Sequence, residues 1–129
     1  MHKRFLIIAA ILGAVSVAMG AFGAHGLKQL LPEENISSFE TGVRYQFYHV
    51  FGLLGIAILW KEFPVKWLRW AGNCFITGII LFSGSLYLLT ALKATDTVGL
   101  NGIGIITPFG GLFFIAGWLL IAAAVSKKK

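Results

Sequence analysis

The sequence predicts an all-α membrane protein, built as an antiparallel bundle of four transmembrane helices with both termini in the cytoplasm. Hydrophobic residues make up 57% of the 129 residues and charged residues only 12%, whereas a soluble domain carries about 25% charged residues. Four apolar segments approach or reach the length that crosses a membrane. The links between them are short, so residues 1–129 are expected to form a single membrane domain.

The first predicted helix, residues 5–24, contains no charged residue and follows the basic pair Lys3 and Arg4. About 20 apolar residues are enough to span the hydrocarbon core. A basic start followed by an apolar stretch also fits a cleavable signal peptide. We favour a retained helix, because Ala10, Ala14 and Ala18 form a stripe of small residues suited to close helix packing.

The second predicted helix, residues 38–60, contains charge near its beginning. Ser37 is expected to cap the helix, with Glu40 three residues later completing a capping box. The uncharged part, residues 45–60, is about 24 Å long, shorter than a hydrocarbon core of about 30 Å. Arg44 is therefore expected near the membrane interface. Glu40 and Arg44 are four residues apart on one helical face and are expected to pair there.

The third and fourth predicted helices cover residues 70–92 and 108–125, and each is uncharged. Between them, the polar, glycine-rich stretch of residues 93–106 is interpreted as a returning turn. Thr107 is expected to cap the fourth helix, and Pro108 is expected at its first position, where a missing backbone N–H breaks no hydrogen bond within the helix.

The distribution of positive charge predicts the orientation. With four spans, the two termini and the middle link share one side of the membrane. That side carries eight of the eleven Lys and Arg residues: Lys3, Arg4, Lys61, Lys66, Arg69, Lys127, Lys128 and Lys129. The other side carries Lys28, Arg44 and Lys93. Because cytoplasmic loops are enriched in Lys and Arg, we expect a multi-pass plasma membrane protein with both ends in the cytoplasm.

Several function classes find no support in the residues. The net charge is +6, but the cations are scattered among apolar segments rather than gathered on one face, so no nucleic acid partner is predicted. Cys74 is the only cysteine, which excludes an intrachain disulfide and a Cys-based zinc site. Haem held by His25 and His49 is disfavoured because the two lie at different depths. No cofactor or metal is predicted.

Four sequence blocks, taken together, resemble a known family. They are GAFGAHGL at residues 20–27, ETGVRYQFYH at 40–49, FSGSLYLL at 82–89 and ITPFGGLFFIAGWLL at 106–120. In this order they resemble the YgdD-like family of small membrane proteins, domain of unknown function 423, which includes transmembrane protein 256. Gly42 stands where the family pattern has alanine. The resemblance implies a four-helix plasma membrane protein, bacterial here, and it supplies no activity and no catalytic residues.

The main candidate site is a polar group near the middle of the membrane. At 100° per residue, Tyr45, Gln46 and His49 share an arc of the second helix that is expected to face the bundle interior. Ser16 and Ser83 lie at a similar depth, each roughly 16 to 20 Å from the cytoplasmic boundary, as does His49. His49 either accepts protons or binds a ligand, or it is neutral and hydrogen-bonded to Ser16 or Ser83 to fix the helix register.

A second group of polar residues is expected at the outer face. Glu40 and Arg44 can bind a zwitterionic lipid headgroup or simply anchor the second helix at the interface. The complete set of outer-face candidates is His25, Glu40, Arg44, Tyr48 and Tyr87.

Three kinds of function follow from these candidates. We favour a non-enzymatic protein that binds a lipid-like or small hydrophobic ligand or stabilises a larger membrane complex, because no nucleophile-plus-base arrangement or pair of acidic residues is evident. One alternative is a small proton-coupled transporter or channel that uses His49 and requires an oligomer. Another is a lipid-modifying enzyme with His25 or His49 as base. The expected partners are membrane lipids, together with a second copy of the chain or another membrane protein.

Overall fold

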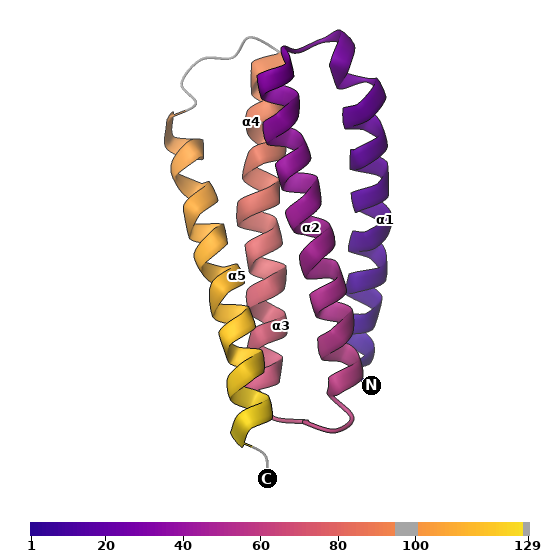
Figure 1. The fold of residues 1–129 in the computed structure, drawn as a ribbon, viewed down its shortest axis with the longest axis vertical. Coiled ribbons are helices and arrows are strands. Elements are labelled where there is room, and N and C mark those ends of the chain that lie inside the picture. Colours follow the sequence, from indigo (N-terminus) through magenta and orange to yellow (C-terminus); the bar gives the residue numbers. More distant parts are fainter. Residues whose placement is uncertain (95–100, 128–129) are drawn as a thin grey trace.

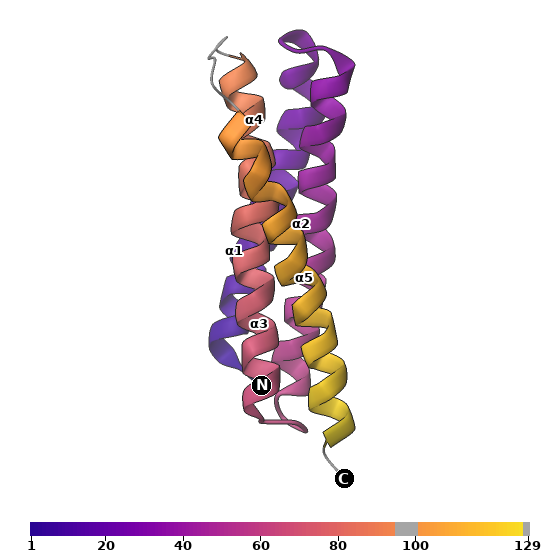
Figure 2. The same ribbon diagram turned by 90° about the vertical axis from the view of Figure 1, so that its left-hand side faces the viewer.

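The computed structural model describes residues 1–94 and 101–127. These residues form four long helices that run antiparallel in chain order, with both termini at the same end (Figures 1 and 2). They are α1 (Lys3–His25), α2 (Glu33–Leu59), a third helix made of α3 (Lys66–Gly78), η2 (Ile79–Ser83) and α4 (Gly84–Ala94), and α5 (Asn101–Lys127). A short helix, η1 (Leu27–Gln29), follows α1. The expected all-α fold is confirmed.

Within the described ranges, three helical segments are long and apolar enough to cross a membrane, namely Lys3–Gln29, Lys66–Ala94 and Gly102–Ser126. The remaining long helix, α2, has 27 residues and carries Glu33 and Glu34 in its first turn. It is about 40 Å long at 1.5 Å per residue and lies alongside the other helices for most of its length (Figure 1).

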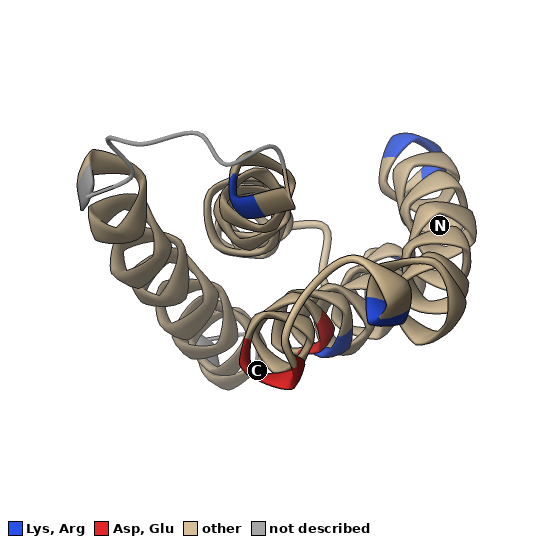
Figure 3. Ribbon diagram, turned by 90° about the horizontal axis from the view of Figure 1, so that it is seen from above, with Lys and Arg blue, Asp and Glu red and all other residues tan. Residues whose placement is uncertain are grey.

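The helices are arranged as two hairpins. In the first, α1 packs mainly against α2, and in the second, α3 and η2 pack against α5. The helix that joins the hairpins is α2, which also contacts α3, η2 and α4. Seen along the bundle, α1 and α5 lie on opposite sides of α2 and α4, and most of the ribbon carries no charge (Figure 3).

Close helix packing in the core depends on glycines that receive aromatic rings. The ring of Phe75, a fully buried residue of α3, lies between Gly52 of α2 and Gly117 of α5. A Cβ atom would come within 2.7 Å of that ring at Gly52 and within 2.5 Å at Gly117. A methyl group at either position would therefore force the helices apart, so small residues let three helices meet around one ring.

The third helix is interrupted by a π-helical turn, η2 (Ile79–Ser83). Such turns insert extra backbone into an α-helix and often occur at functional sites. In this turn, Ser83 is fully buried and donates a hydrogen bond of 2.6 Å to the carbonyl oxygen of Gly42 in α2. The π-turn is thus tied directly to the second helix.

The predicted start of the second helix is wrong. The helix begins at Glu33, with Pro32 as its N-cap residue, so Ser37 lies within it and does not cap it. Glu33 and Glu34 occupy the first turn, where negative charge favours the positive end of the helix dipole. The prediction followed the apolar stretch and missed the polar turn before it.

The predicted start of the fourth helix is also wrong. Helix α5 already includes Asn101, so Thr107 is not its cap and Pro108 lies inside it. A proline inside a transmembrane helix is tolerated when its surroundings compensate for the lost backbone bond. Of the expected loop at residues 93–106, positions 101–106 are helical, and positions 95–100 lie outside the described residues. The first and third helices extend slightly beyond their predicted ranges of 5–24 and 70–92.

Candidate functional site

His49 is buried between α2 and α5, with both ring nitrogens hydrogen-bonded. Its Nδ1 lies 2.7 Å from the carbonyl oxygen of Tyr45, and its Nε2 accepts a 3.0 Å hydrogen bond from the indole Nε1–H of Trp118. A carbonyl oxygen can only accept and an indole N–H can only donate. The two contacts therefore require a neutral imidazole that carries its proton on Nδ1.

Aromatic side chains enclose the imidazole of His49. The Phe114 ring stacks on it with a centroid distance of 3.6 Å, and the Phe75 ring meets it edge-on at 5.0 Å. The predicted partners of His49 are wrong. Ser16 donates instead to the carbonyl oxygen of Leu12, and Ser83 to that of Gly42. His49 thus links α2 to α5 through Trp118, and the serines belong to other contacts.

A second buried network connects three helices through Gln46. The side-chain amide of Gln46, which is 1% exposed, donates a 3.0 Å hydrogen bond to the carbonyl oxygen of Leu12 in α1. Its amide oxygen accepts a 2.6 Å hydrogen bond from the hydroxyl of Tyr87 in α4. Tyr87, a candidate for the outer face, is therefore part of the interior network.

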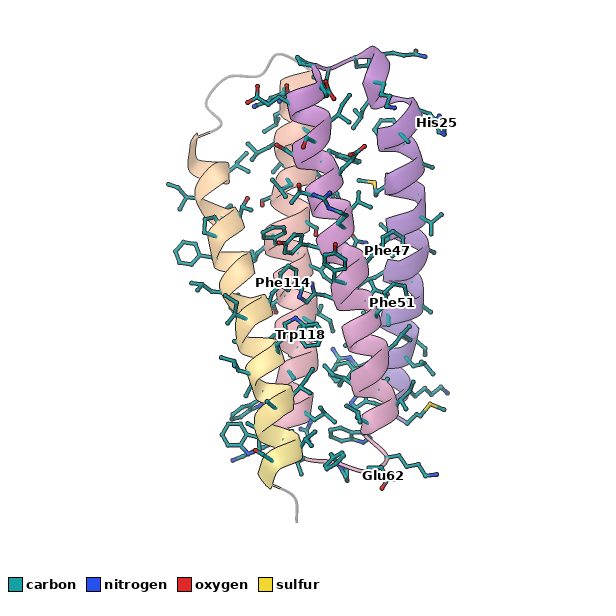
Figure 4. The ribbon with its side chains drawn as sticks, in the orientation of Figure 1. His25, Phe47, Phe51, Glu62, Phe114 and Trp118 are labelled. Atoms are coloured by element: carbon teal, nitrogen blue, oxygen red, sulfur yellow. The ribbon has the colours of Figure 1, made fainter. Side chains whose placement is uncertain are left out.

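A groove runs along the surface between α2 and α5. Its wider part has a volume of about 530 Å³ and its narrower part a volume of about 320 Å³. Both parts are bordered by Tyr48 and Trp118, so they lie next to each other, and we call them together the α2–α5 groove. In Figure 4, Phe114 and Trp118 extend from α5 toward α2. The remaining lining residues are Tyr45, His49, Phe51, Gly52, Gly55, Ile56, Leu59, Gly111, Ile115 and Ile121.

The α2–α5 groove has few polar groups, and they differ in whether they already form hydrogen bonds. Both nitrogens of His49 are engaged. The phenolic hydroxyls of Tyr45 and Tyr48, by contrast, have no hydrogen-bond partner among the described residues. Tyr45 is 39% exposed and Tyr48 is 53% exposed. The groove is therefore lined mainly by aromatic and aliphatic side chains and offers two available hydroxyl donors.

The outer-face candidates are not assembled into one site. Arg44 donates a 3.0 Å hydrogen bond to the hydroxyl of Thr41, and no ion pair between Arg44 and Glu40 occurs in the described part of the chain, so the expected pair is absent. Glu40 instead borders a polar hollow of about 550 Å³ together with Lys28 and Glu33. His25 is the last residue of α1, is exposed and points away from the bundle (Figure 4).

Within residues 1–94 and 101–127, no cluster of side chains is suited to coordinate a metal ion. No group of three or more His, Cys, Asp or Glu side chains is positioned to hold a metal ion in that part of the chain. A bond from His49 to haem iron would also have to displace Trp118 or the Tyr45 carbonyl. The structure thus offers His49 as a hydrogen-bonded link between helices.

The sequence-based site missed the contribution of α5. Gly111, Phe114, Ile115 and Trp118 line the groove, and their spacing of three, four and seven residues is that of one helical face. This spacing was a usable signal, since the face combines a glycine, which leaves space, with two aromatic rings. Which helix that face would meet could not be read from the spacing.

Comparisons with known proteins give a consistent result. A family profile described as "Protein of unknown function (DUF423)" matches residues 19–111. The UPF0382 membrane protein YwdK of Bacillus subtilis is 39% identical over 126 residues, which cover 97% of this chain and 98% of that protein. The UPF0382 inner membrane protein YgdD of Escherichia coli is 37% identical, with 100% and 95% covered. A UPF0382 membrane protein of Haemophilus influenzae is 38% identical, with 100% and 98% covered. No solved structure matches.

Proposed function

Because the chain belongs to the DUF423 family of membrane proteins, a family of unknown function, we propose that it is a non-enzymatic plasma membrane protein that binds a lipid-like hydrophobic ligand in the α2–α5 groove. The expected family resemblance is confirmed.

We further propose that the chain crosses the membrane four times, with both termini in the cytoplasm. Among the described residues, three helices have the required length and apolarity. The fourth, α2, lies between them and buries Gln46 and His49 against its neighbours, where both side chains are hydrogen-bonded to other helices. Its apolar portion continues to Leu59, close to Lys61 and the other cations of the termini-bearing end. The positive charge concentrated at that end favours the cytoplasm.

The observation that carries the binding proposal is the α2–α5 groove itself. Its wider part measures about 530 Å³ and is lined mainly by aromatic and aliphatic side chains, as are small-molecule sites in general. The groove opens on the outer surface of the bundle, where lipid chains would surround a membrane protein. A hydrophobic molecule can therefore enter from the side, without crossing the core.

Proton transport through His49 receives no support from its hydrogen bonds. A second proton on the imidazole would place an N–H on Nε2, opposite the N–H of Trp118, and the bond between them would be lost. Ser16 and Ser83 each donate to a backbone carbonyl and not to His49. These contacts favour a structural role for His49 over a proton relay.

A glycine that borders the groove provides the test. A Cβ atom at Gly111 would meet only one described neighbour within 4 Å, an atom of the Phe82 ring at 3.9 Å. The variant Gly111→Leu should therefore fold and fill the groove with its side chain, because leucine also favours a helix over glycine. The matched control is Gly104→Leu on the same helix, since no atom of the described residues lies within 4 Å of a Cβ there.

The intact protein and both variants would be purified in mild detergent, and the hydrophobic molecules that accompany each would be quantified per protein by mass spectrometry. We expect one class of molecule to accompany the unchanged protein and Gly104→Leu and to be lost from Gly111→Leu. Equal recovery from all three proteins would contradict the proposal. Loss of a self-associated form in Gly111→Leu, with unchanged lipid content, would instead identify the groove as a contact between copies.

A further inference from the structure

We infer that the ligand of the α2–α5 groove is a glycerophospholipid whose phosphate binds Arg44, whose ester carbonyl oxygens accept hydrogen bonds from Tyr45 and Tyr48, and whose acyl chain lies along the groove. This inference rests on the proposed function and specifies the chemical class of its ligand. It also assigns the ligand to the leaflet at the end of the bundle opposite the termini.

The two tyrosine hydroxyls call for a hydrogen-bond acceptor. Tyr48 precedes Lys61 by thirteen residues, which places it about 20 Å from the termini-bearing boundary and thus inside a hydrocarbon core of about 30 Å. A hydroxyl without a partner is costly in an apolar environment, and neither Tyr45 nor Tyr48 has one among the described residues. Both line the same part of the groove. An acceptor oxygen on the ligand would satisfy these donors.

Arg44 provides a positive charge toward the η1 end of the groove, where the phosphate of the lipid would lie. It precedes Tyr48 by four residues and therefore lies one helical turn farther toward the η1 end, on the same face of α2. By the same rise it is about 26 Å from the termini-bearing boundary, near the opposite edge of the hydrocarbon. Its side chain is exposed, and the bond to Thr41 occupies only one of its guanidinium donors. Arginine binds phosphate oxygens strongly through such paired donors.

The shape of the groove favours an acyl chain over a protein helix. From Tyr45 to Leu59 it follows α2 for about 21 Å. A helix of that length and of about 10 Å diameter would occupy roughly 1,600 Å³, whereas the wider part of the groove measures 530 Å³ and the narrower part 320 Å³. Gly55 borders the narrower part, and no atom of the described residues lies within 4 Å of a Cβ added there, which leaves space for a thin, flexible chain.

The first experiment compares two lipids that differ only in their carbonyl oxygens. Dioleoyl phosphatidylglycerol and the diether lipid with the same headgroup and chains would be titrated separately into the full-length, delipidated protein, and bound lipid would be measured by native mass spectrometry. We expect the diester to bind more tightly by about three- to tenfold for each tyrosine hydrogen bond, which is the usual contribution of a neutral hydrogen bond. In Tyr48→Phe, the diester should lose the part of this advantage that comes from Tyr48, while diether binding stays unchanged.

The second experiment tests the phosphate contact. Arg44→Gln should weaken binding of dioleoyl phosphatidylglycerol by about tenfold or more, because hydrogen bonds to a charged group are stronger. Binding of dioleoylglycerol, which has the same esters but no phosphate, should not change. Lys28→Gln is the matched control, since Lys28 lies at the same end of the bundle but borders a different hollow.

The outcomes separate this inference from the proposed function. Equal binding of diester and diether to the unchanged protein, or no effect of Tyr48→Phe and Arg44→Gln, would overturn the assignment to a glycerophospholipid. If Gly111→Leu still lost its co-purifying hydrophobic molecule in that case, the groove would remain the site of a different ligand. If Gly111→Leu also retained that molecule, the proposed function would fail as well.

Discussion

At the scale of single residues, His49 holds α5 against α2, because its Nε2 accepts a hydrogen bond from Trp118 while its Nδ1 is bonded to the Tyr45 carbonyl oxygen. A neutral imidazole that fixes helix packing was one of the two interpretations of its sequence position, although the expected partners were Ser16 and Ser83. Trp118 lies 69 positions away along the chain, and no spacing within one helix could identify it.

The link between Trp118 and His49 predicts a measurable loss of stability when it is removed. Trp118→Phe retains an aromatic ring but leaves Nε2 of His49 without its donor. We expect the free energy of unfolding to fall by about 0.6 kcal/mol and by no more than about 1.7 kcal/mol, the range for hydrogen bonds between membrane helices. Thermal unfolding in detergent measures the change, with Trp70→Phe as control. Equal midpoints for the two variants would contradict the predicted role.

A different histidine, His2, occupies the termini-bearing end. Its Nδ1 accepts a 3.3 Å hydrogen bond from the backbone N–H of Phe5, and its ring stacks on the Phe5 ring at 4.0 Å. The ring also meets Trp60 edge-on at 4.9 Å. Burial lowers the pKa of His2 below its ordinary value of 6.5, and the nearby cations Arg4 and Arg69 lower it further. Only the neutral imidazole can accept the hydrogen bond that caps α1.

This arrangement predicts a loss of stability in acid. Because the pKa of His2 is lower in the folded protein, the unfolded protein binds the proton more readily. The contribution of His2 is therefore complete above about pH 6.5 and is lost as the pH falls toward the lower folded-state pKa. In His2→Asn, which can cap the helix without titrating, the decrease in unfolding midpoint from pH 8 to pH 5 should be smaller. An unchanged decrease would contradict the assignment.

At the scale of helices, the sequence predicted the apolar stretches well and the helix ends poorly. Hydrophobic length follows from the membrane, which requires about 20 apolar residues per span. The first turns of α2 and α5 extend beyond the predicted starts and contain residues that are not part of an apolar run, such as Glu33 in α2. The π-turn Ile79–Ser83 also carried no sequence signal that we could interpret.

The contact between α5 and the π-turn predicts a glycine that cannot be enlarged. A Cβ atom at Gly110 would overlap the backbone nitrogen of Phe82 and lie 2.7 Å from its Cβ. Gly110→Ala should therefore separate α5 from the π-turn and lower the free energy of unfolding by about 1 to 3 kcal/mol, as other overpacked cores do. The measurement is thermal or denaturant unfolding in detergent.

Gly104→Ala serves as the control for this substitution. It lies on the same helix, but no atom of the described residues is within 4 Å of its added Cβ. Its stability should rise by up to about 1 kcal/mol, because alanine favours a helix over glycine. If both alanine variants were equally stable, the close approach at Gly110 would not exist in the folded protein.

At the scale of the whole molecule, family and fold class were accessible from the sequence. The four sequence blocks indicated the family that the comparisons confirm, and the composition indicated a helical membrane protein. The assembly of the site was only partly accessible. Tyr45, His49 and Tyr48 were candidates and do line one groove, but the opposite wall of that groove comes from α5, which requires knowledge of how the helices pack.

The proposed orientation is tested by cysteine labelling in intact cells. In a Cys74→Ser background, Gln29→Cys places a thiol beyond α1 and Glu62→Cys places one in the link after α2, and both original side chains are exposed. A membrane-impermeant maleimide should label Gln29→Cys directly and Glu62→Cys only after the cells are permeabilised. Direct labelling of both would exclude a spanning α2, and the opposite pattern would reverse the orientation.

The division into two hairpins has a consequence for how the polypeptide can be assembled. Helices form individually in a membrane because each satisfies its own backbone hydrogen bonds, and they associate afterwards by side-chain packing. The link between α2 and α3 holds Glu62, exposed at the surface of the bundle (Figure 4). We therefore expect residues 1–62 and 63–129, produced as separate polypeptides in one cell, to find each other and restore the bundle. The covalent link between α2 and α3 would then not be required for assembly, and α2 would provide the contacts by which the two halves recognise each other.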